Sequence, residues 1–498
     1  MEQISRRRFM KVASMGMCGV AAELCWGSPA FPGKLVLPDT QTVDLANPKA
    51  GSVFDQAEAE TRRILEKMQV KLQNELTESP TPLIDSIRMR FIHMAMWPPI
   101  APLAQDFLTW IGDSHTARKR LFFLMPLVEW MSEPFLLPVE TGGTPEEQTR
   151  EVDKIFKRMA ELRKQGFTST LDNVGDASLS PEDASAYRNY YATLIRAFLE
   201  SGEGDELYLS LKLSALVHDL DAALESGETA RAKQQEIVTA ITDLLTLGAN
   251  APDRKVFLRI DMEEYCYKDM TLRLFREIVE GFPSIVVDGN GDLRLGVVIQ
   301  AYLRDSGPDV QELVEWARPR ELRVPIRLVK GAYLDHERTV AAEQGYPSPV
   351  WDNKPSTDAN FEALSAYMLL NLNVVLPAFA THNIRSQAHA IALTEAYGLP
   401  NNIARIQMLY GMGDPIKHVV AAMGRPLREY IPAGSLARGL KYAGRRFEEL
   451  SNSDNALAKT MRGDFSGVDG SAPTFVGERD IQDSEEMRTI LAQAVTEK

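Results

Sequence analysis

The sequence has few cysteines, which excludes two ways of stabilising a fold. Only three occur in 498 residues, namely Cys18, Cys25 and Cys266, and the first two stand close to the N-terminus. A disulfide framework or a cysteine-based metal site is therefore not expected. The 7 histidines also lack the spacing of metal ligands, so we expect no metal site of that kind either.

The sequence also lacks an excess of positive charge. Its 55 lysines and arginines are outnumbered by 69 aspartates and glutamates, which gives a net charge of -14 at pH 7. A groove that binds nucleic acid needs surplus cations to neutralise phosphates, so nucleic acid is not an expected partner. Binding of a small anion would depend on a local group of cations.

Long apolar runs and one common cofactor motif are missing as well. After the opening segment, no apolar run approaches the ~20 residues that a membrane-spanning helix needs. No Gly-x-Gly-x-x-Gly follows a predicted strand, so a Rossmann dinucleotide site is not indicated. The composition, with 44% hydrophobic and 25% charged residues and no tandem repeat, is that of a globular protein.

The opening segment resembles an export signal. Ser5-Arg6-Arg7-Arg8-Phe9-Met10-Lys11 precedes a short apolar stretch and the small-residue triplet Ser28-Pro29-Ala30, a pattern similar to a twin-arginine signal. We therefore expect residues 1–30 to direct export to the periplasm or the membrane periphery. The alternative is a basic, disordered start of a cytoplasmic protein.

The segment that follows predicts a linker and a helical arm over residues 31–165. Its first part is rich in Pro, Gly, Asp and Asn, and its later apolar residues then fall near helical spacing. The clearest of these apolar positions are Phe54, Ile64, Met68 and Leu72. We expect the main domain to span residues 166–455 and a C-terminal tail to span residues 456–498.

The main domain predicts repeated β/α units. Short apolar or β-branched runs alternate with long amphipathic segments, which is typical of a parallel sheet covered by helices. The runs are residues 168–174, 207–213, 256–261, 296–302, 325–329, 374–380, 403–409 and 427–431. Eight such runs over about 290 residues predict a TIM-like (β/α)8 barrel, an α/β fold.

The run from Leu207 to Leu213 shows how side chains divide between the two faces of a strand. Leu209 and Leu211 alternate with Ser210 and Lys212, so one face is apolar and the other ends in a lysine. In a barrel the apolar face meets the helices. Lys212 is therefore expected to point inward at the carboxyl end of its strand.

Polar residues end most of the other predicted strands. A single polar residue at a strand end is usually a helix cap, but their recurrence favours a common site, because barrels place their chemistry at the carboxyl ends of the strands. The residues in question are Asp261, Gln300, Arg327, Thr381, His382, Asn383 and Gln407. We expect these residues to line the site.

A last amphipathic helix follows the eighth strand. Ser435 is a suitable N-cap, and Arg445 and Arg446 come within the helix that it begins. Two guanidinium groups placed directly after the last strand could clamp a small carboxylate over the barrel mouth. An ordinary solvated helix face, supported by Arg445 and Glu449, is the alternative.

Several motifs in the main domain together resemble the proline dehydrogenase family. The order and approximate spacing of these motifs match that family over about residues 166–455. They are Leu209-Ser210-Leu211-Lys212-Leu213-Ser214, Val298-Ile299-Gln300-Ala301-Tyr302, Arg327-Leu328-Val329-Lys330-Gly331-Ala332-Tyr333, Phe379-Ala380-Thr381-His382-Asn383, Gly411-Met412-Gly413-Asp414-Pro415, Tyr430-Ile431-Pro432-Ala433-Gly434 and Tyr442-Ala443-Gly444-Arg445-Arg446-Phe447-Glu448-Glu449. The segment is similar to the dehydrogenase domain of bifunctional proline utilisation proteins.

The resemblance implies an activity, a cofactor and partners. Members of the family oxidise L-proline to 1-pyrroline-5-carboxylate on a distorted (β/α)8 barrel that holds FAD, and they pass the electrons to membrane quinone. The resemblance thus implies peripheral membrane contact. The chain leaves no room for the aldehyde dehydrogenase half of the bifunctional proteins, so a separate 1-pyrroline-5-carboxylate dehydrogenase is expected to act next.

The resemblance also implies roles for individual residues. Lys212, Arg445 and Arg446 would bind the substrate carboxylate, and Asp176 would pair with Arg445 as a gate. The residues implied to surround the substrate ring are Leu328, Tyr333, Tyr430 and Tyr442. The implied FAD contacts are Asp261, Val298, Gln300, Arg327, Lys330, Gly331, Ala332, Thr381, His382, Asn383 and Glu449, to which the strand-end pattern adds Gln407.

Two other functions stay open at this point. One is a different flavin-dependent barrel oxidoreductase, although a family such as the methylenetetrahydrofolate reductases lacks the Arg-Arg helix. The other is an inactive barrel that binds proline without oxidising it. The presence of Lys212, Arg445 and Arg446 counts against the second alternative.

Overall fold

The computed structural model describes the main domain and parts of the arm. The described residues are 50–78, 135–139, 145–175, 177–201, 204–249, 251, 254–288, 292–396, 398–435, 439, 442, 446 and 456–461. The predicted export signal over residues 1–30 lies outside them, and so does most of the C-terminal tail. The predicted domain boundaries remain predictions.

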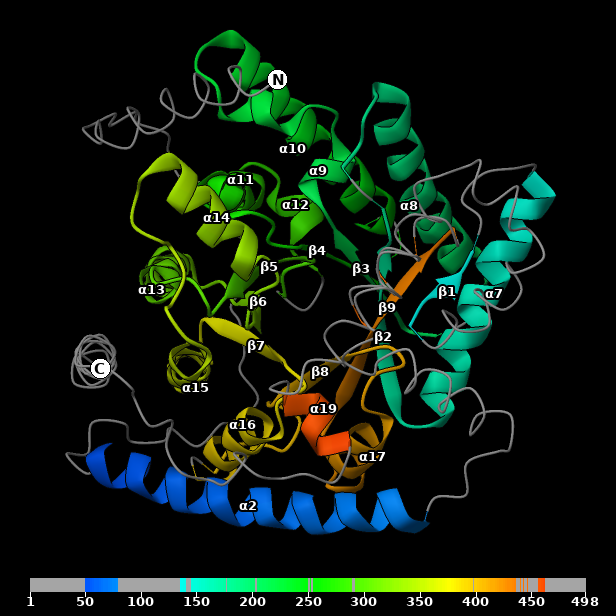
Figure 1. Cartoon of the computed structure of the whole chain (residues 1–498). Coiled ribbons are helices and arrows are strands. Elements are labelled where there is room, and N and C mark those ends of the chain that lie inside the picture. Colours follow the sequence, from blue (N-terminus) through cyan, green and yellow to red (C-terminus); the bar gives the residue numbers. More distant parts are fainter. Residues whose placement is uncertain are drawn as a thin grey trace.

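Within the described residues, eight parallel strands close into a barrel (Figure 1). They are β2 (Phe167–Asn173), β3 (Glu206–Leu211), β4 (Lys255–Ile260), β5 (Leu295–Gln300), β6 (Val324–Val329), β7 (Val375–Ala380), β8 (Arg405–Leu409) and β9 (Leu427–Gly434). Each strand pairs with the next along the chain, and β9 pairs with both β8 and β2. The predicted (β/α)8 fold is confirmed.

Helices follow the strands and cover the outside of the barrel. The longer ones are α8 (Pro181–Ser201), α10 (Glu228–Ala249), α11 (Tyr265–Gly281), α13 (Ser306–Ala317), α14 (Leu334–Gln344), α15 (Lys354–Leu370), α16 (Ile384–Ala396) and α17 (Asp414–Ala422). Shorter turns are α9 (Leu213–Leu216), α12 (Pro283–Val286), η2 (Leu220–Leu224) and η3 (Arg318–Arg320). The alternation of strands and helices matches the alternation of apolar runs in the sequence.

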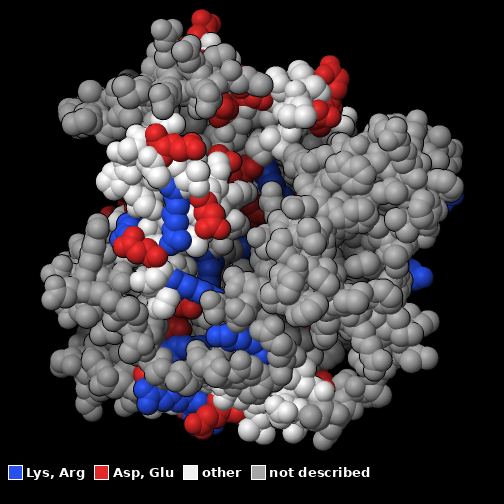
Figure 2. All heavy atoms as spheres, viewed as in Figure 1, with Lys and Arg blue, Asp and Glu red and all other residues white. Residues whose placement is uncertain are grey.

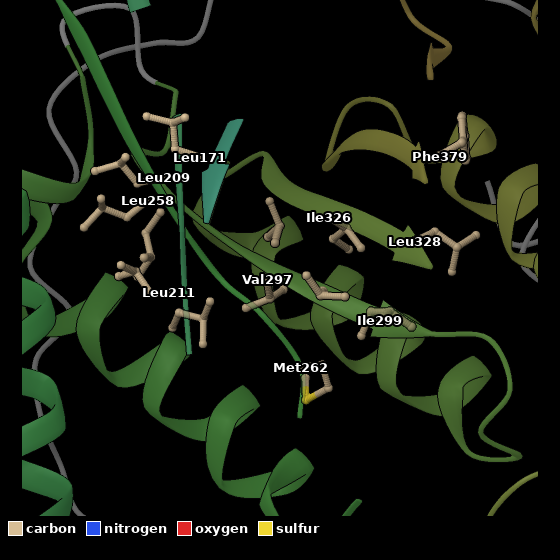
Figure 3. Close-up of a cluster of buried hydrophobic side chains, with 14 of the residues drawn as sticks. Leu171, Leu209, Leu211, Leu258, Met262, Val297, Ile299, Ile326, Leu328 and Phe379 are labelled. Atoms are coloured by element: carbon tan, nitrogen blue, oxygen red, sulfur yellow. The ribbon is translucent and has the colours of Figure 1, made fainter. Parts of the chain in front are cut away.

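The main core lies between the strands and the helices. Leu207, Leu209 and Leu211 are fully buried on the outer face of β3, as the alternation predicts. Figure 3 shows Leu209 and Leu211 among apolar side chains from neighbouring strands, including Leu258 and Val297. The residues between them, such as Ser210, face the barrel interior, so burying one face fixes which side chains reach the site.

The helical arm is confirmed in part. α2 (Ala50–Glu78) and α7 (Pro145–Lys164) lie within the predicted segment, and α2 runs along α16 and α17 in Figure 1. Residues 79–134 are outside the described part of the chain. The arm also contains a strand that helical spacing did not predict, β1 (Leu137–Pro138).

β1 pairs with the end of β9, which extends further than the sequence predicts. The prediction ends at Ile431, whereas β9 continues to Gly434. Ala433 and Gly434 pair with β1, and the Val139 N–H donates to the Gly434 carbonyl at 3.0 Å. Two residues are too few to show alternation, so only the tertiary pairing defines β1.

The helix predicted after β9 is described at three positions. Gly439, Tyr442 and Arg446 are helical, and the Gly439 N–H donates to the Ser435 carbonyl at 2.9 Å. A Cβ atom on Gly439 would lie 1.9 Å from the side chain of Leu136, so this helix packs closely on the segment around β1. The described chain ends with α19 (Ala456–Met461).

None of the described helices is both long enough and apolar enough to cross a membrane.

Candidate active site

Lys212 lies at the carboxyl end of β3 and forms an ion pair with Asp172 of β2. The Lys212 Nζ is 2.6 and 2.7 Å from the two carboxylate oxygens of Asp172. Burial alone would lower the pKa of Lys212, but the Asp172 carboxylate outweighs it and raises that pKa above its ordinary value. Lys212 is therefore a permanent cation inside the barrel, as the strand alternation predicted.

Arg327 of β6 joins side chains from several strands. Its guanidinium donates to Gln407 Oε1 at 2.8 Å, to Ser210 Oγ at 3.0 Å and to Asp261 Oδ1 at 2.7 Å. The hydroxyl of Tyr430 donates to the other oxygen of Asp261 at 2.8 Å. The barrel thus brings together four of the predicted site residues, Asp261, Arg327, Gln407 and Tyr430.

Tyr430 is held in its neutral form in this network. Burial, reinforced by the charges of Asp172 and Asp261, raises the pKa of Tyr430 well above its ordinary value. The Arg327 guanidinium lies 5.2 Å from the centre of the Tyr430 ring, a favourable cation–π distance. The phenol therefore remains a hydrogen-bond donor at any physiological pH.

A second group of predicted site residues gathers where β6 and β7 end. Lys330 forms an ion pair with Asp358 of α15 and donates to Ser386 Oγ at 3.1 Å. Asn383 donates from its side-chain amide to the other oxygen of Asp358 at 3.3 Å. The Thr381 N–H donates to the Gln407 carbonyl at 3.2 Å, which ties this loop to β8.

His382 is partly buried and neutral. The Leu409 N–H donates to its Nε2 at 3.0 Å, so the ring proton resides on Nδ1. Nδ1 is buried and has no hydrogen-bond partner among the described residues. Burial, together with the charges of Lys417 and Arg446, lowers the pKa of His382 to about 3.

This depressed pKa predicts a pH dependence of stability. The unfolded chain takes up a proton at His382 below about pH 6.5, whereas the folded protein does not until about pH 3. The free energy of unfolding should therefore fall as the pH drops through this window. Urea unfolding measures the free energy of unfolding at pH 7.5 and at pH 5. The decrease between the two pH values is expected to be smaller in His382→Asn than in the wild-type protein, by on the order of 1–2 kcal/mol. Equal losses in the two proteins would contradict a neutral His382 in the folded protein.

Two further predicted cofactor residues, Val298 and Gln300, lie on β5. Gln300 is buried and donates to the Met262 carbonyl at 3.3 Å, while its Oε1 has no partner among the described residues. Val298 is also buried and is aligned with Arg327 across the β5–β6 ladder. Both side chains therefore lie on the inner face of β5.

Gly331 and Ala332 leave exposed backbone beyond the end of β6. The φ angle of Gly331 is +131°, and a Cβ atom there would lie 2.4 Å from the Tyr302 ring. Only glycine fits this position, because a side chain would meet both the backbone strain and the ring. The turn places peptide groups, rather than side chains, at the open surface.

Leu328 does not join the inward-facing residues. It follows Arg327 in β6, so its side chain lies on the opposite face, where it is fully buried in the apolar cluster of Figure 3. Strand alternation is the reason, since consecutive residues cannot both face inward. Tyr333 packs on a separate small cluster of Tyr302, Leu303 and Val350 beside the site.

Part of the predicted carboxylate clamp can be placed. Arg446 is partly buried, and its guanidinium carbon lies 4.9 Å from the centre of the Tyr442 ring. The charge of Arg446 also contributes to the lowered pKa of His382, so the helix after β9 brings a cation to this region. Asp176, Arg445 and Glu449 lie outside the described residues.

Some residues of the site were not singled out from the sequence. Asp172, the partner of Lys212, stands four residues before the acid that the resemblance suggested. Ser210 holds Arg327, and Glu263 accepts hydrogen bonds from the N–H and the hydroxyl of Ser214, just after Lys212. The inward parity of Asp172 and Ser210 was readable from their strands, whereas their partners were not.

Arg259 is a buried cation one layer below Arg327. It is paired in register with Gly296 on β5, and it donates to the carbonyls of Val297 and Pro325 at 3.2 and 3.3 Å. Burial, together with the charge of Arg327, lowers the pKa of Arg259 well below its ordinary value. This charge adds to the positive potential inside the barrel.

Charged side chains gather near the middle of the face shown in Figure 2, over the strands at the centre of Figure 1. Within the described residues, no group of three or more His, Cys, Asp or Glu side chains is arranged to hold a metal ion. The arrangement instead suits a small anionic or zwitterionic molecule, because fixed cations stand beside hydrogen-bonding groups. Fold and site together define a (β/α)8-barrel protein with a charged site at the carboxyl ends of its strands.

Comparison with known proteins specifies the family. A family model described as proline dehydrogenase matches residues 155–459. The chain therefore belongs to the proline dehydrogenase family.

Individual relatives agree with this assignment. The bifunctional protein PutA of Escherichia coli (strain K12) is 31% identical over 300 residues, which are 58% of this chain and 22% of that protein. Proline dehydrogenase 1 of Bacillus subtilis (strain 168) is 28% identical over 284 residues, 57% of this chain and 79% of the relative. The chain thus spans about a fifth of the bifunctional relatives it matches and most of the shorter ones.

Solved structures show the same fold. The crystal structure of proline utilization A (PutA) from Bdellovibrio bacteriovorus inactivated by N-propargylglycine matches with a TM-score of 0.68 and 26% identity. The match covers 88% of this chain and 48% of that one. It therefore extends beyond the region that the family model matches.

Proposed function

We propose that this protein is a flavin-dependent L-proline dehydrogenase. It oxidises L-proline to 1-pyrroline-5-carboxylate, with FAD as cofactor and membrane quinone as the acceptor of two electrons. The observation that carries the proposal is the network of Lys212, Asp172, Arg327, Asp261 and Tyr430 inside the barrel of a member of this family. The Bdellovibrio relative is inactivated by N-propargylglycine, which is itself a small amino acid derivative.

The cations of the site are suited to orient a small amino acid. Lys212 and Arg446 bind the carboxylate, and the fork of a guanidinium matches the two carboxylate oxygens. Tyr430 and Tyr442 lie beside Arg327 and Arg446 respectively and supply apolar ring faces for the pyrrolidine ring. Fixing a bound substrate in this way removes much of the orientational entropy from the barrier.

The same cations prepare the substrate nitrogen. Proline carries a protonated ring nitrogen at neutral pH, and that proton must leave before the C–N bond can be oxidised. Lys212 and Arg327 disfavour a further positive charge nearby and so lower the pKa of the bound amine. Asp172 and Asp261 pair with these two cations and offset part of this effect.

The residues at the carboxyl ends of β5, β6 and β7 fit the proposed cofactor. Gln300 Oε1 and His382 Nδ1 are buried polar atoms without partners among the described residues, one an acceptor and the other a donor. Lys330, Asn383 and the exposed peptide groups at Gly331 add further contacts for a polar, phosphate-bearing molecule. When bound, FAD accepts the hydride that the substrate loses.

A visible spectrum of the purified protein tests the proposal directly. Flavin bands that bleach after anaerobic addition of L-proline support the cofactor, the substrate and the reaction together. Bands that remain oxidised would leave a flavin-dependent barrel with another substrate. A colourless protein that also takes up no added FAD would favour a barrel that only binds proline.

Replacing Arg446 is expected to weaken proline binding without releasing the flavin. Loss of a charged hydrogen bond to the carboxylate should raise the KM for proline about 50-fold in Arg446→Met. Arg446→Lys keeps the charge but loses the fork, so its KM should be intermediate. Steady-state kinetics with a soluble quinone analogue measures both, and an unchanged KM in Arg446→Met would remove Arg446 from the carboxylate site.

We also propose that the protein works at a membrane after export. The twin-arginine-like segment Ser5–Lys11 supports export, and a quinone acceptor requires peripheral contact with the bilayer. A separate 1-pyrroline-5-carboxylate dehydrogenase then consumes the product. Cell fractionation should find the protein outside the cytoplasm. Changing Arg6 and Arg7 together to lysine should keep the protein in the cytoplasm. A wild-type protein that is found in the cytoplasm with its full N-terminus would refute export.

A further inference from the structure

The N-terminal helix α2 is bound to the barrel by both apolar and charged contacts. Ile64, Leu65, Met68 and Leu72 form its apolar face and are each at most 2% exposed. α2 lies along α16 and α17, as Figure 1 shows. Helix α16 is the helix that begins directly after the Thr381-His382-Asn383 segment.

The charged contacts near the start of α2 converge on Arg385. Glu58 accepts hydrogen bonds from Arg385 Nη1 at 3.3 Å and Nη2 at 3.0 Å, and Glu362 of α15 accepts one from Nη2 at 3.1 Å. The Arg385 side chain is only 11% exposed. A cation buried to this degree depends on both carboxylates, because solvent compensates little of its charge.

Arg385 belongs to the first turn of α16, and this turn is tied to the predicted cofactor residues. Asn383 Oδ1 accepts from the N–H groups of Arg385 at 3.0 Å and Ser386 at 3.4 Å, which caps the helix. Ser386 Oγ accepts from Lys330 at 3.1 Å. Asp358, one turn before Glu362 on α15, holds both Lys330 and Asn383.

These contacts form two adjacent rows. One row consists of Asp358 and Glu362 on α15, and the other consists of Asn383, Arg385 and Ser386 at the start of α16. Glu58 is the residue of this group that comes from outside the barrel domain. Glu58 and Glu362 both accept a hydrogen bond from Arg385 Nη2. Through the first turn of α16, Glu58 is thereby linked to Asn383 and Lys330.

We infer that Glu58 is a positioning residue for the cofactor site, and that docking of α2 raises the affinity of the protein for FAD. This inference rests on the proposed function, since it assumes that Lys330 and Asn383 contact FAD. The helix therefore does more than cover apolar surface. It orders the cofactor loop, by which we mean Lys330 after β6, Asp358 on α15 and Asn383 just before α16.

The same helix pair provides a matched control. Arg63 of α2 pairs with Glu395 at 3.3 Å, near the C-terminal end of α16 and away from the cofactor loop. Arg63→Gln and Glu58→Gln each remove one ion pair between the same two helices. Only the second is expected to change the cofactor site.

The experiment is a titration of FAD into full-length apoprotein, followed by flavin fluorescence. Glu58→Gln should raise the Kd for FAD about tenfold, whereas Arg63→Gln should change it less than about twofold. Glu58→Asp keeps the carboxylate and should recover part of the affinity. Thermal unfolding of the apoproteins shows whether both Gln variants are folded; if Glu58→Gln is not, Arg385→Lys, which keeps the charge but loses the two-pronged contact, should show the same weakening.

The outcomes separate two kinds of failure. If the wild-type protein binds FAD and Glu58→Gln, Arg385→Lys and Arg63→Gln all bind it with the wild-type affinity, the inference alone would be overturned. An equal weakening in Glu58→Gln and Arg63→Gln would also overturn it, because the effect would then come from general docking. A wild-type protein that binds no flavin would overturn the proposed function and the inference with it.

Discussion

Lys212→Met is expected to raise the KM for proline about 100-fold and to lower the free energy of unfolding by about 3–5 kcal/mol. The first effect follows from removing the cation that we propose to bind the substrate carboxylate. The second arises because Asp172, whose side chain is only 4% exposed, would keep a buried charge without its partner. Lys212 Nζ lies 2.6 Å from that carboxylate, so the pair is direct.

A double variant separates these two effects. Combining Lys212→Met with Asp172→Asn removes both charges, so most of the lost stability should return, while proline binding should stay weak. Chemical denaturation and steady-state kinetics on the single and double variants complete the cycle. A normal KM in Lys212→Met, with flavin bound, would show that Lys212 serves only the fold.

Arg327→Met is expected to lower the rate of flavin reduction by proline by about 10²–10³-fold while the flavin stays bound. Arg327 is only 4% exposed and orders Gln407, Ser210 and Asp261 at distances between 2.7 and 3.0 Å. Its removal takes a fixed positive charge from the place where the proposed reaction transfers electrons. It also leaves Asp261 held by Tyr430 alone among the described residues.

Anaerobic stopped-flow spectroscopy measures this rate directly. Arg327→Lys is the matched control, since it retains the charge but cannot hold three partners, and its rate should lie between those of wild type and Arg327→Met. A rate in Arg327→Met that equals the wild-type rate would exclude Arg327 from the reaction. A loss of bound flavin in both variants would instead assign Arg327 mainly to cofactor binding.

The strands were predictable because their physics is local. A half-buried strand alternates apolar and polar residues, and Leu207 to Leu211 show that alternation without any tertiary information. The same parity placed Lys212, Asp261, Arg327 and Gln407 on the inner face. The family resemblance placed Leu328 beside the substrate ring, which conflicts with this alternation. The structure places Leu328 on the outer face of its strand.

The pairings inside the site were not predictable in the same way. Lys212 could have faced several acids, and it meets Asp172 because β2 and β3 pair in the register that aligns Leu171 with Leu209. Arg327 and Gln407 are 80 residues apart in sequence and meet only because β6 and β8 stand on the same side of a closed sheet. A local sequence pattern does not predict contacts between residues so far apart in the chain.

Sequence alone thus determined the barrel, the face of each strand that turns inward and, through the motifs, the family of the chain. These features depend on periodicity and on residue types that neighbours in the chain specify. Tertiary structure decided which charges pair, that β9 extends to bind β1, that His382 is held neutral, and that Glu58 of α2 reaches Arg385. Each of these depends on segments brought together by burial of apolar surface, which fixes distances that the order of residues leaves open.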